Sequence, residues 1–379
     1  MRILKIFGKV LLLVITLLVA LMYINPSVKD SHTEEAYINL QEEREGMAPE
    51  EKSIIQRIIL FGDAGHATIE PWQASMVKVT ERATISPEKT AVVALGDNIY
   101  MRGYPTKDEG QEDWSKDQLE SISFLDAQLK VAKESGAKLF LVPGNHDWYA
   151  TEVDGQAAHI ARYAEINSVA VHFEPYEDGA PSMAESEDLP GVSLVFLDSE
   201  WALTSRGKDR EAVLKTLDSQ LARISEEKPD NLIVINAHHP LETYGPHGGH
   251  LAEFSYWMIM NTLYLFTDAA AEDTFGENYA GLIESINTIL SKYDKVIYAA
   301  GHDHNLQVLR RPASGGPAYN IVSGAANSNK VSGVWHGNNT RFALSQEGFV
   351  ELSVTADGTY LQIFDIHHEE PIAGFWLAL

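Results

Sequence analysis

Short apolar runs recur along the chain from residue 57 onward, separated by longer and more polar stretches. Continuous runs of four or five apolar residues are typical of strands that are buried on both faces of a sheet. Close to the C-terminus, an Asp-Gly pair joins two further runs, 349–354 and 360–366, and predicts a β-hairpin. The seven runs predicted to be buried strands are residues 57–61, 91–95, 138–142, 193–197, 232–236, 295–299 and 319–322.

Amphipathic stretches lie between several of these runs. Residues 118–134 and 209–226 carry Leu, Val and Ala at helical spacing, and residues 279–290 do the same and predict a surface helix. Strands that alternate with helices indicate an α/β domain whose sheets are covered by helices. The aromatic and apolar stretch 254–266 leaves two interpretations open: a helix packed on the core, or a lid or membrane-contacting patch.

The N-terminus has the pattern of a targeting segment. Arg2, Lys5 and Lys9 precede an apolar run over residues 10–24. A basic flank followed by an apolar core predicts that residues 1–24 are a signal peptide or an N-terminal membrane anchor. The run shows no clear cleavage site, which favours the anchor. Because the positive flank stays in the cytoplasm, the rest of the chain is expected to be extracytoplasmic.

The segment that follows, residues 25–53, is polar and rich in Glu, and we interpret it as an acidic flexible tether. Residues 54–379 would then form one folded domain. The composition, 45% hydrophobic and 22% charged, is that of a globular protein. A formal net charge of −25 repels phosphate backbones and excludes general nucleic-acid binding. The chain has no Cys, which excludes disulfides, thiolate metal ligands and a cysteine nucleophile.

Five of the predicted strands end in clusters of Asp, Asn, Tyr and His. Sites of α/β folds are built at the carboxyl ends of strands, and these side chains are the oxygen and nitrogen donors of metal centres. One such cluster would usually be turn chemistry, whereas five together indicate a shared metal site. The clusters are Gly62-Asp63-Ala64-Gly65, Gly96-Asp97-Asn98-Ile99-Tyr100, Gly144-Asn145-His146-Asp147, Ala237-His238-His239-Pro240 and Gly301-His302-Asp303-His304.

In order and in composition, these clusters resemble the motif set of the purple acid phosphatases, within the calcineurin-like metallophosphoesterases. Gly65 stands where many relatives carry a ligating His, and Tyr100 is available in its place. The resemblance spans residues 62–304 and implies the small single-domain form. Its expected architecture is an αββα sandwich, in which two mixed β-sheets lie between helices.

The resemblance also implies a binuclear metal centre. Hard anionic donors suit Fe(III) in the first site, whereas imidazoles and a neutral amide suit a divalent ion such as Fe, Zn or Mn in the second. Asp147 and Asp303 are interpreted as supporting or turn residues. The implied ligands are Asp63, Tyr100 and His304 for the first ion, Asn145, His238 and His302 for the second, and Asp97 as a bridge between both.

Two ions about 3.5–4 Å apart would clamp a phosphate ester and supply hydroxide for in-line attack on phosphorus, even below neutral pH. By the same resemblance, His146 would contact the phosphate and protonate the leaving alcohol. His247, nine residues after His238, is expected to be a second substrate-facing residue, and His66, next to Gly65, a neighbour of the ligands.

The expected function is therefore that of an exported acid phosphatase that hydrolyses small phosphate monoesters. Two alternatives stay open. The same site could hydrolyse phosphodiesters or nucleotide anhydrides, because both reactions use the same pair of ions. A third interpretation is a non-catalytic, metal-binding protein tethered to a membrane, for which His146 and His247 would have no purpose.

Overall fold

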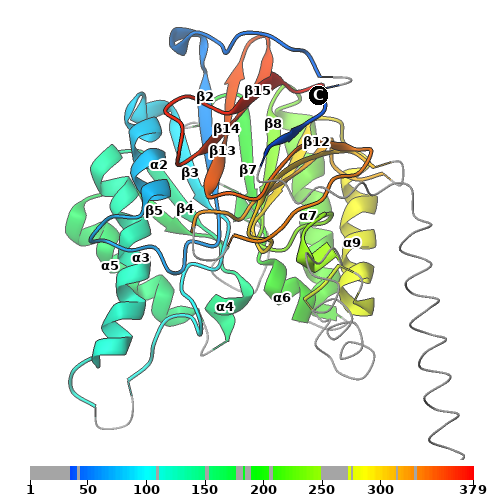
Figure 1. Cartoon of the computed structure of the whole chain (residues 1–379). Helices are drawn as coiled ribbons and strands as arrows, with labels where there is room; N and C mark the ends of the chain where they lie inside the picture. The colour runs from blue at the N-terminus through cyan, green and yellow to red at the C-terminus, as the bar shows by residue number, and fades with distance from the viewer. Residues whose placement is uncertain are drawn as a thin grey trace, which may run out of the picture.

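Two mixed β-sheets face each other at the centre of the protein, with helices on both outer sides (Figure 1). This arrangement confirms the predicted α/β sandwich. The chain is seen in a computed structural model, which describes residues 35–40, 43–107, 111–149, 153–175, 182–183, 189–204, 208–248, 272–274, 276–312, 315–327 and 331–379.

One sheet has seven strands in the order β15-β14-β13-β2-β3-β4-β5. Strands β2 to β5 pair in parallel, and β13 to β15 extend the sheet with antiparallel pairs. The predicted hairpin is β13 and β14. The strands are β2 (Gln56–Phe61), β3 (Thr90–Ala94), β4 (Lys138–Leu141), β5 (Val171–Phe173), β13 (Gly348–Thr355), β14 (Gly358–Asp365) and β15 (Ala373–Trp376).

The other sheet has eight strands in the order β1-β12-β10-β11-β9-β8-β7-β6. Strands β7, β8, β9 and β11 pair in parallel, and the remaining pairs are antiparallel. The strands are β1 (Tyr37–Ile38), β6 (Ser182–Met183), β7 (Val192–Phe196), β8 (Leu232–Asn236), β9 (Val296–Ala300), β10 (Leu306–Arg310), β11 (Tyr319–Ser323) and β12 (Thr340–Leu344).

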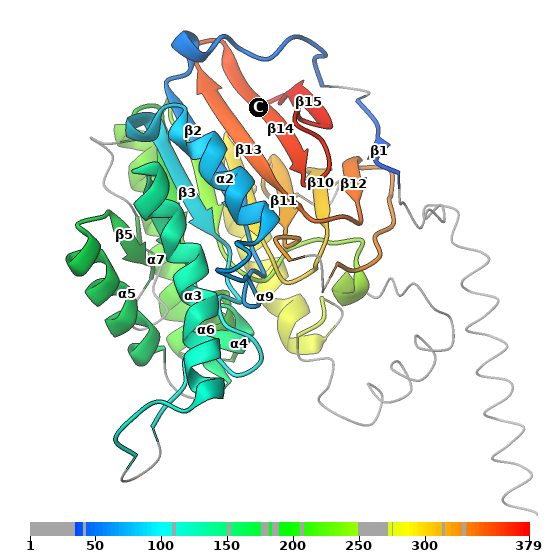
Figure 2. The same cartoon turned by 60° about the vertical axis from the view of Figure 1, so that its left-hand side comes forward.

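Helices cover the outer face of each sheet. Figure 2 shows α2 and α3 in front of the seven-stranded sheet, with α5 beside them. Helices α6, α7 and α9 pack on the other sheet. The α-helices are α2 (Ala74–Thr84), α3 (Lys116–Ser135), α4 (Asn145–Trp148), α5 (Asp154–Asn167), α6 (Ser199–Thr204), α7 (Lys208–Glu227) and α9 (Glu277–Leu290), and the 3-10 turns are η1 (Glu51–Ser53), η2 (Pro87–Lys89) and η4 (Pro246–Gly248).

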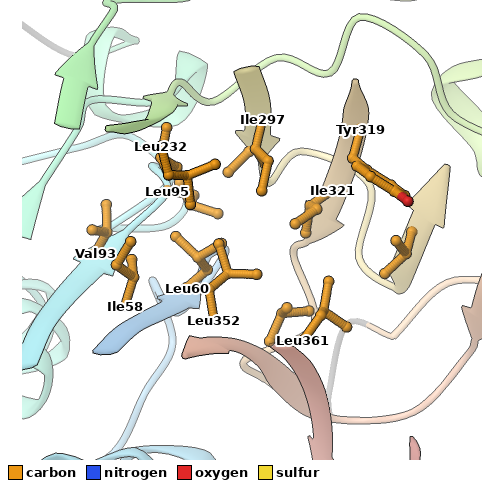
Figure 3. Close-up of a cluster of buried hydrophobic side chains, with 14 of the residues drawn as sticks. Ile58, Leu60, Val93, Leu95, Leu232, Ile297, Tyr319, Ile321, Leu352 and Leu361 are labelled. Carbon is orange, nitrogen blue, oxygen red and sulfur yellow. The ribbon is translucent and has the colours of Figure 1, made fainter. Parts of the chain in front are cut away.

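The core lies in three layers because successive side chains of a strand point to opposite faces. Ile58 and Leu60 of β2 join the cluster between the sheets, where Figure 3 shows them near Ile297 and Ile321 of the facing sheet. The intervening residue, Ile59, packs in the layer under the helices. These strands are buried on both faces, and for this reason they appear in the sequence as continuous apolar runs.

Part of the predicted tether is bound to the domain. Tyr37 and Ile38 form β1, which pairs with β12. Glu43 is buried and forms ion pairs with Arg341 (2.6 Å) and Arg310 (3.3 Å). The expectation of a solvated tether is therefore corrected at Tyr37, Ile38 and Glu43, because polar composition alone did not reveal these partners on remote strands.

Two predicted segments, residues 1–24 and 254–266, lie outside the described part of the chain. Of the helices that the structure describes, none has both the length and the apolar character needed to cross a bilayer.

A charged cluster is enclosed where the seven-stranded sheet meets α2. Arg57 and Glu351 lie on paired strands, are both fully buried, and form an ion pair of 3.0 Å. Arg82 of α2 binds the same carboxylate through two nitrogens at 2.8 and 2.9 Å. Glu51 completes the cluster through Arg57 at 2.5 Å. The cluster joins η1, β2, β13 and α2 around a buried Arg57–Glu351 pair, with Glu51 at its exposed edge.

We predict that Glu351→Gln lowers the free energy of unfolding by about 3–5 kcal/mol, because it removes the buried charge partner of Arg57 and leaves only the exposed Glu51. Chemical denaturation at pH 7 measures this difference. Glu227→Gln is the control: it breaks an exposed ion pair with Arg223 and should cost less than about 1 kcal/mol. Equal effects of the two substitutions would contradict the structural role of the cluster.

Candidate metal centre

The candidate ligands lie at the edge where the carboxyl ends of the two sheets' parallel strands come together. Asp63 follows β2, Asp97 and Tyr100 follow β3, and Asn145 follows β4 of one sheet. His238 follows β8 of the other sheet, and His302 and His304 follow β9. Parallel strands expose their carboxyl ends on the same side, so the facing sheets bring these loops into one site.

Three side chains converge on the first predicted ion position. The Tyr100 hydroxyl donates a hydrogen bond to Asp63 Oδ1 at 2.9 Å, and its oxygen is 3.0 Å from His304 Nε2. His304 Nε2 is also 3.3 Å from Asp63 Oδ1. These three ligand-type atoms therefore lie around a common point, although their residues are separated by up to 241 positions in sequence numbering, 304 − 63.

The second predicted group is equally close. His238 Nε2 is 3.0 Å from Asn145 Oδ1 and 3.2 Å from His302 Nδ1. Asp97 links the groups, since its Oδ1 is 3.4 Å from His238 Nε2 and its carboxylate is hydrogen-bonded to Tyr100. Ligand-type atoms of Asp63, Asp97 and His238 all lie within 4.8 Å of one another. The structure thus brings all seven predicted ligands together, and their binding of ions stays a prediction.

The backbone at the strand ends is strained and closely packed. Asp63, Asp97 and His302 are non-glycine residues with φ of 60°, 53° and 69°, in the left-handed region that such residues rarely adopt. A Cβ at Gly144 would lie 2.3 Å from the Asp97 carboxylate, and one at Gly301 would lie 2.4 Å from the Asp63 carboxylate. These motif glycines are therefore required for the carboxylates to enter the site.

Backbone carbonyls orient two of the imidazoles. His238 Nδ1 lies 2.8 Å from the Leu95 carbonyl oxygen, and His302 Nε2 lies 2.9 Å from that of Glu272. A carbonyl only accepts, so each of these nitrogens carries the proton. The other nitrogen of each ring then directs a lone pair into the site, as a metal ligand must.

A family model described as calcineurin-like phosphoesterase matches residues 56–306, which include all five motifs. The chain belongs to this family. Activity of the family depends on metal ions, and the oxygen and nitrogen donors gathered in this metallophosphoesterase fit such ions. No curated protein matches the sequence.

Solved structures with the same fold are distant in sequence. GAP50, described as the anchor in the inner membrane complex of Plasmodium, has a TM-score of 0.52 and 16% identity, with 85% of this chain and 88% of GAP50 covered. PhoD has a TM-score of 0.48 and 12% identity, with 84% of this chain and 68% of PhoD covered. At these identities, the likeness to GAP50 shows the fold alone.

The two predicted catalytic histidines border the ligands of the metallophosphoesterase site. His146 Nδ1 lies 2.8 Å from the Met101 carbonyl oxygen, and Nε2 lies 3.9 Å from the Asp97 carboxylate. His247 stacks on His302, with ring centroids 3.8 Å apart, and its Nδ1 is 2.8 Å from Asp273. Their side chains are 18% and 32% exposed, so both reach solvent beside the buried ligands.

The pKa values of several site residues are shifted by burial and by the many nearby carboxylates. Burial raises the pKa of Asp63, but hydrogen bonding and the charges of His304 and His238 outweigh it and hold the pKa below its usual value. Burial and the charges of Asp63 and Asp97 raise the pKa of Tyr100 well above 10. Burial lowers the pKa of His247, but hydrogen bonding to Asp273 and nearby carboxylates raises it to about 9.

Three further carboxyls lie buried around the ligands. Burial and the charge of Asp97 raise the pKa of Asp147 to about 7, against backbone hydrogen bonds that lower it. Burial likewise raises the pKa of Asp198 to about 7, and burial with the charges of Glu272 and Asp198 raises that of Glu200 to about 8. Asp147 supports the site as expected, since it accepts backbone hydrogen bonds from Gly144, Asn98 and Ile99.

Several neighbours of the ligands were missed by sequence reasoning. Tyr149 and Glu272 both contact the Asn145 amide nitrogen, at 2.7 and 3.1 Å. The four-residue spacing of Asn145 and Tyr149 on a short helix was a signal that could have indicated their contact. Glu272 and Asp273 lie outside every motif. His66, expected near the ligands, packs its ring against Tyr100 and Phe124.

We predict that the metal-depleted protein becomes less stable as pH rises from 5 to 8. Asp147, Asp198 and Glu200 have folded-state pKa values of about 7 to 8, above the 3.8 to 4.5 of unfolded carboxyls. The folded state therefore holds more protons, and stability is lost as pH rises through 7 to 8. Thermal unfolding at both pH values measures this change.

Added Zn²⁺ should reduce this pH dependence, because bound cations replace the protons as compensating charge. Asp198→Asn is the matched variant, since it removes one of the three carboxyls, and its unfolding temperature should change less between pH 5 and pH 8. A metal-depleted protein that is more stable at pH 8 than at pH 5 would contradict the prediction.

Proposed function

We propose that this metallophosphoesterase is a binuclear-metal acid phosphatase that hydrolyses small phosphate monoesters, with Fe(III) in the first site and divalent Fe, Zn or Mn in the second. The observation that carries the proposal is the position of the Tyr100 hydroxyl, 2.9 Å from Asp63 and 3.0 Å from His304. Two carboxylates and a phenol oxygen form a hard donor group of the kind that suits a trivalent ion.

The seven ligands would hold the ions as the motifs imply, with Asp97 between them. When bound, the ions would neutralise phosphate charge and acidify a water molecule, which favours activity below neutral pH. The protein's own residues would do the remaining work. Asn145 contributes a neutral oxygen, so the second site carries less charge than the first and suits a divalent ion.

His146 is placed to assist the leaving group. Its Nδ1 proton is held by the Met101 carbonyl oxygen, so Nε2 is the atom available to a substrate on the side of Asp97. A protonated Nε2 could donate its proton to the departing alkoxide oxygen. His247, held by Asp273, supplies a second donor for phosphate oxygens at the other side of the ligands.

The proposal includes location outside the cytoplasm, with the membrane reached through residues 1–24. Its support is the sequence pattern of Arg2, Lys5 and Lys9 before an apolar run. GAP50 is described as an anchor in a membrane complex, and this description supports a second candidate function, a tethered non-catalytic protein. The presence of all seven ligand types together with His146 and His247 favours the enzyme.

We predict that the purified protein, loaded with iron and zinc, hydrolyses p-nitrophenyl phosphate at pH 5 faster than bis(p-nitrophenyl) phosphate at pH 5 or pH 8. His146→Ala should lower kcat by about 10²-fold or more on an alkyl phosphate, whose leaving group needs a proton. The loss should be smaller on p-nitrophenyl phosphate, because its phenolate leaves readily. Release of phosphate and of nitrophenol measures these rates.

His172→Ala is the control, since that histidine lies on β5, where it stacks on Phe140. A faster diester reaction would favour the phosphodiesterase, and no hydrolysis of either ester would favour the tethered protein. An unchanged alkyl phosphate rate in His146→Ala would refute the role of this residue.

We predict that the iron-loaded protein absorbs visible light and that Tyr100→Phe loses this band, because the colour requires a phenolate bound to Fe(III). Tyr104→Phe is the matched control, since its hydroxyl contacts His159 and belongs to neither ligand group. Spectra recorded with equal iron content make the comparison. A colourless wild type that contains iron would argue against the Tyr100–Fe(III) assignment.

A further inference from the structure

The Asn145 amide is held by two groups that no motif includes. Its nitrogen donates to the Tyr149 hydroxyl oxygen at 2.7 Å and to Glu272 Oε2 at 3.1 Å. The Tyr149 hydroxyl in turn donates to Glu272 Oε1 at 2.5 Å. A primary amide has two N–H donors, and both are used here. This closed ring leaves one orientation for the amide, with Oδ1 toward His238 Nε2 at 3.0 Å.

The same residue orients a second ligand through its backbone. The Glu272 carbonyl oxygen accepts from His302 Nε2 at 2.9 Å. The Nδ1 lone pair of His302 is therefore directed into the site, 3.2 Å from His238 Nε2. A single residue thus controls the orientation of two of the three ligands that are predicted for the second ion alone.

The two residues after Glu272, Asp273 and Thr274, contact His247, which is predicted to face the substrate. Asp273 Oδ1 lies 2.8 Å from His247 Nδ1, and the Thr274 backbone nitrogen donates to the His247 carbonyl oxygen at 2.9 Å. Residues 272–274 therefore contact both the second ligand group and one phosphate-facing histidine. They lie between the fourth and the fifth motif in the sequence and belong to neither.

The negative charge of the Glu272 carboxylate would also affect the second ion directly. The second group consists of an amide and two imidazoles, which are neutral as ligands, and it shares the Asp97 carboxylate with the first. A carboxylate that contacts Asn145 from behind adds negative charge next to the ion without occupying a coordination position. When a group that hydrogen-bonds a metal ligand is removed by mutation, metal affinity typically falls by about 10–100-fold.

We propose that Glu272 is a positioning residue for the second metal ion: its carboxylate fixes the Asn145 amide and adds charge beside the ion, and its carbonyl fixes His302. This inference rests on the proposed function for the presence of a second ion in that group. It does not depend on which phosphate ester the protein hydrolyses.

The test is calorimetric titration of the metal-depleted protein with Zn²⁺. Wild type should bind two ions. Glu272→Gln keeps the shape and the backbone carbonyl but loses the charge, so one of the two binding events should weaken by about 10–100-fold while the other is unchanged. Tyr149→Phe opens the hydrogen-bonded ring and should weaken the same event.

Glu242→Gln is the matched control, because Glu242 is also a carboxylate with low exposure, and its described hydrogen-bond partner is Asn339. It should bind both ions as wild type does. Unfolding temperatures of the metal-depleted proteins show whether each variant is folded, and Glu272→Gln is expected to match wild type, so that weaker binding is not the result of unfolding.

Unchanged affinities in Glu272→Gln would overturn the inference and leave the proposed function intact. Complete loss of one ion, beyond about 10³-fold, would also overturn it, because Glu272 would then be a direct ligand. A wild type that binds a single ion overturns it as well. If the expected weakening occurs but no monoester is hydrolysed, the inference stands and the proposed function fails.

Discussion

Buried negative charge, at the edge where the two sheets face each other, is the constraint on which the rest of this site depends. Asp63, Asp97 and Asp147 are each at most 2% exposed. The ion pairs that the structure describes for Asp63 and Asp97 are made with histidines. A buried carboxylate is costly unless it is compensated, so this edge requires protons or cations. Metal ions meet that requirement, and the imidazoles among the carboxylates are further donors to them.

The backbone conformation allows the carboxylates of Asp63 and Asp97 to reach the same point. Asp63 and Asp97, in the loops after β2 and β3, have left-handed conformations, and their carboxylates contact His302 and His238 of the facing sheet's loops. The adjoining glycines permit this because a Cβ at Gly144 or Gly301 would collide with a carboxylate. The strain is tolerated because the strands on either side are fixed by a close-packed core between two sheets.

An outer layer of groups decides how the ligands point. Leu95 and Glu272 supply the carbonyls that select the imidazole nitrogens, and Asp147 joins the loops after β3 and β4 through backbone hydrogen bonds. This layer also concentrates acidic groups beside the ligands, since burial and the charges of Glu272 and Asp198 raise the pKa of Glu200 to about 8. Residues far from the motifs in the sequence therefore contact the predicted ligands directly.

Local signals determined what could be predicted from the sequence. The buried strands were continuous apolar runs, and the donors followed directly after them, so the α/β domain and the five donor clusters were recognisable, whereas the choice of seven ligands among those donors came from the resemblance to a family. Strands such as β10 and β12 mix polar with apolar residues and gave no such signal. Glu43 was interpreted as part of a solvated tether, because its partners Arg310 and Arg341 lie 267 (310 − 43) and 298 (341 − 43) positions away in the sequence.

By itself, then, the sequence determined which donor atoms are present and in what order they follow the strands. Only the tertiary structure decided which atoms face each other, which nitrogen of each imidazole is free, and that Glu272 holds Asn145 across 127 positions. The physical reason is that a strand and its following residue are specified by neighbours in the chain. A contact between two sheets is specified by packing, which brings together residues that no sequence spacing relates.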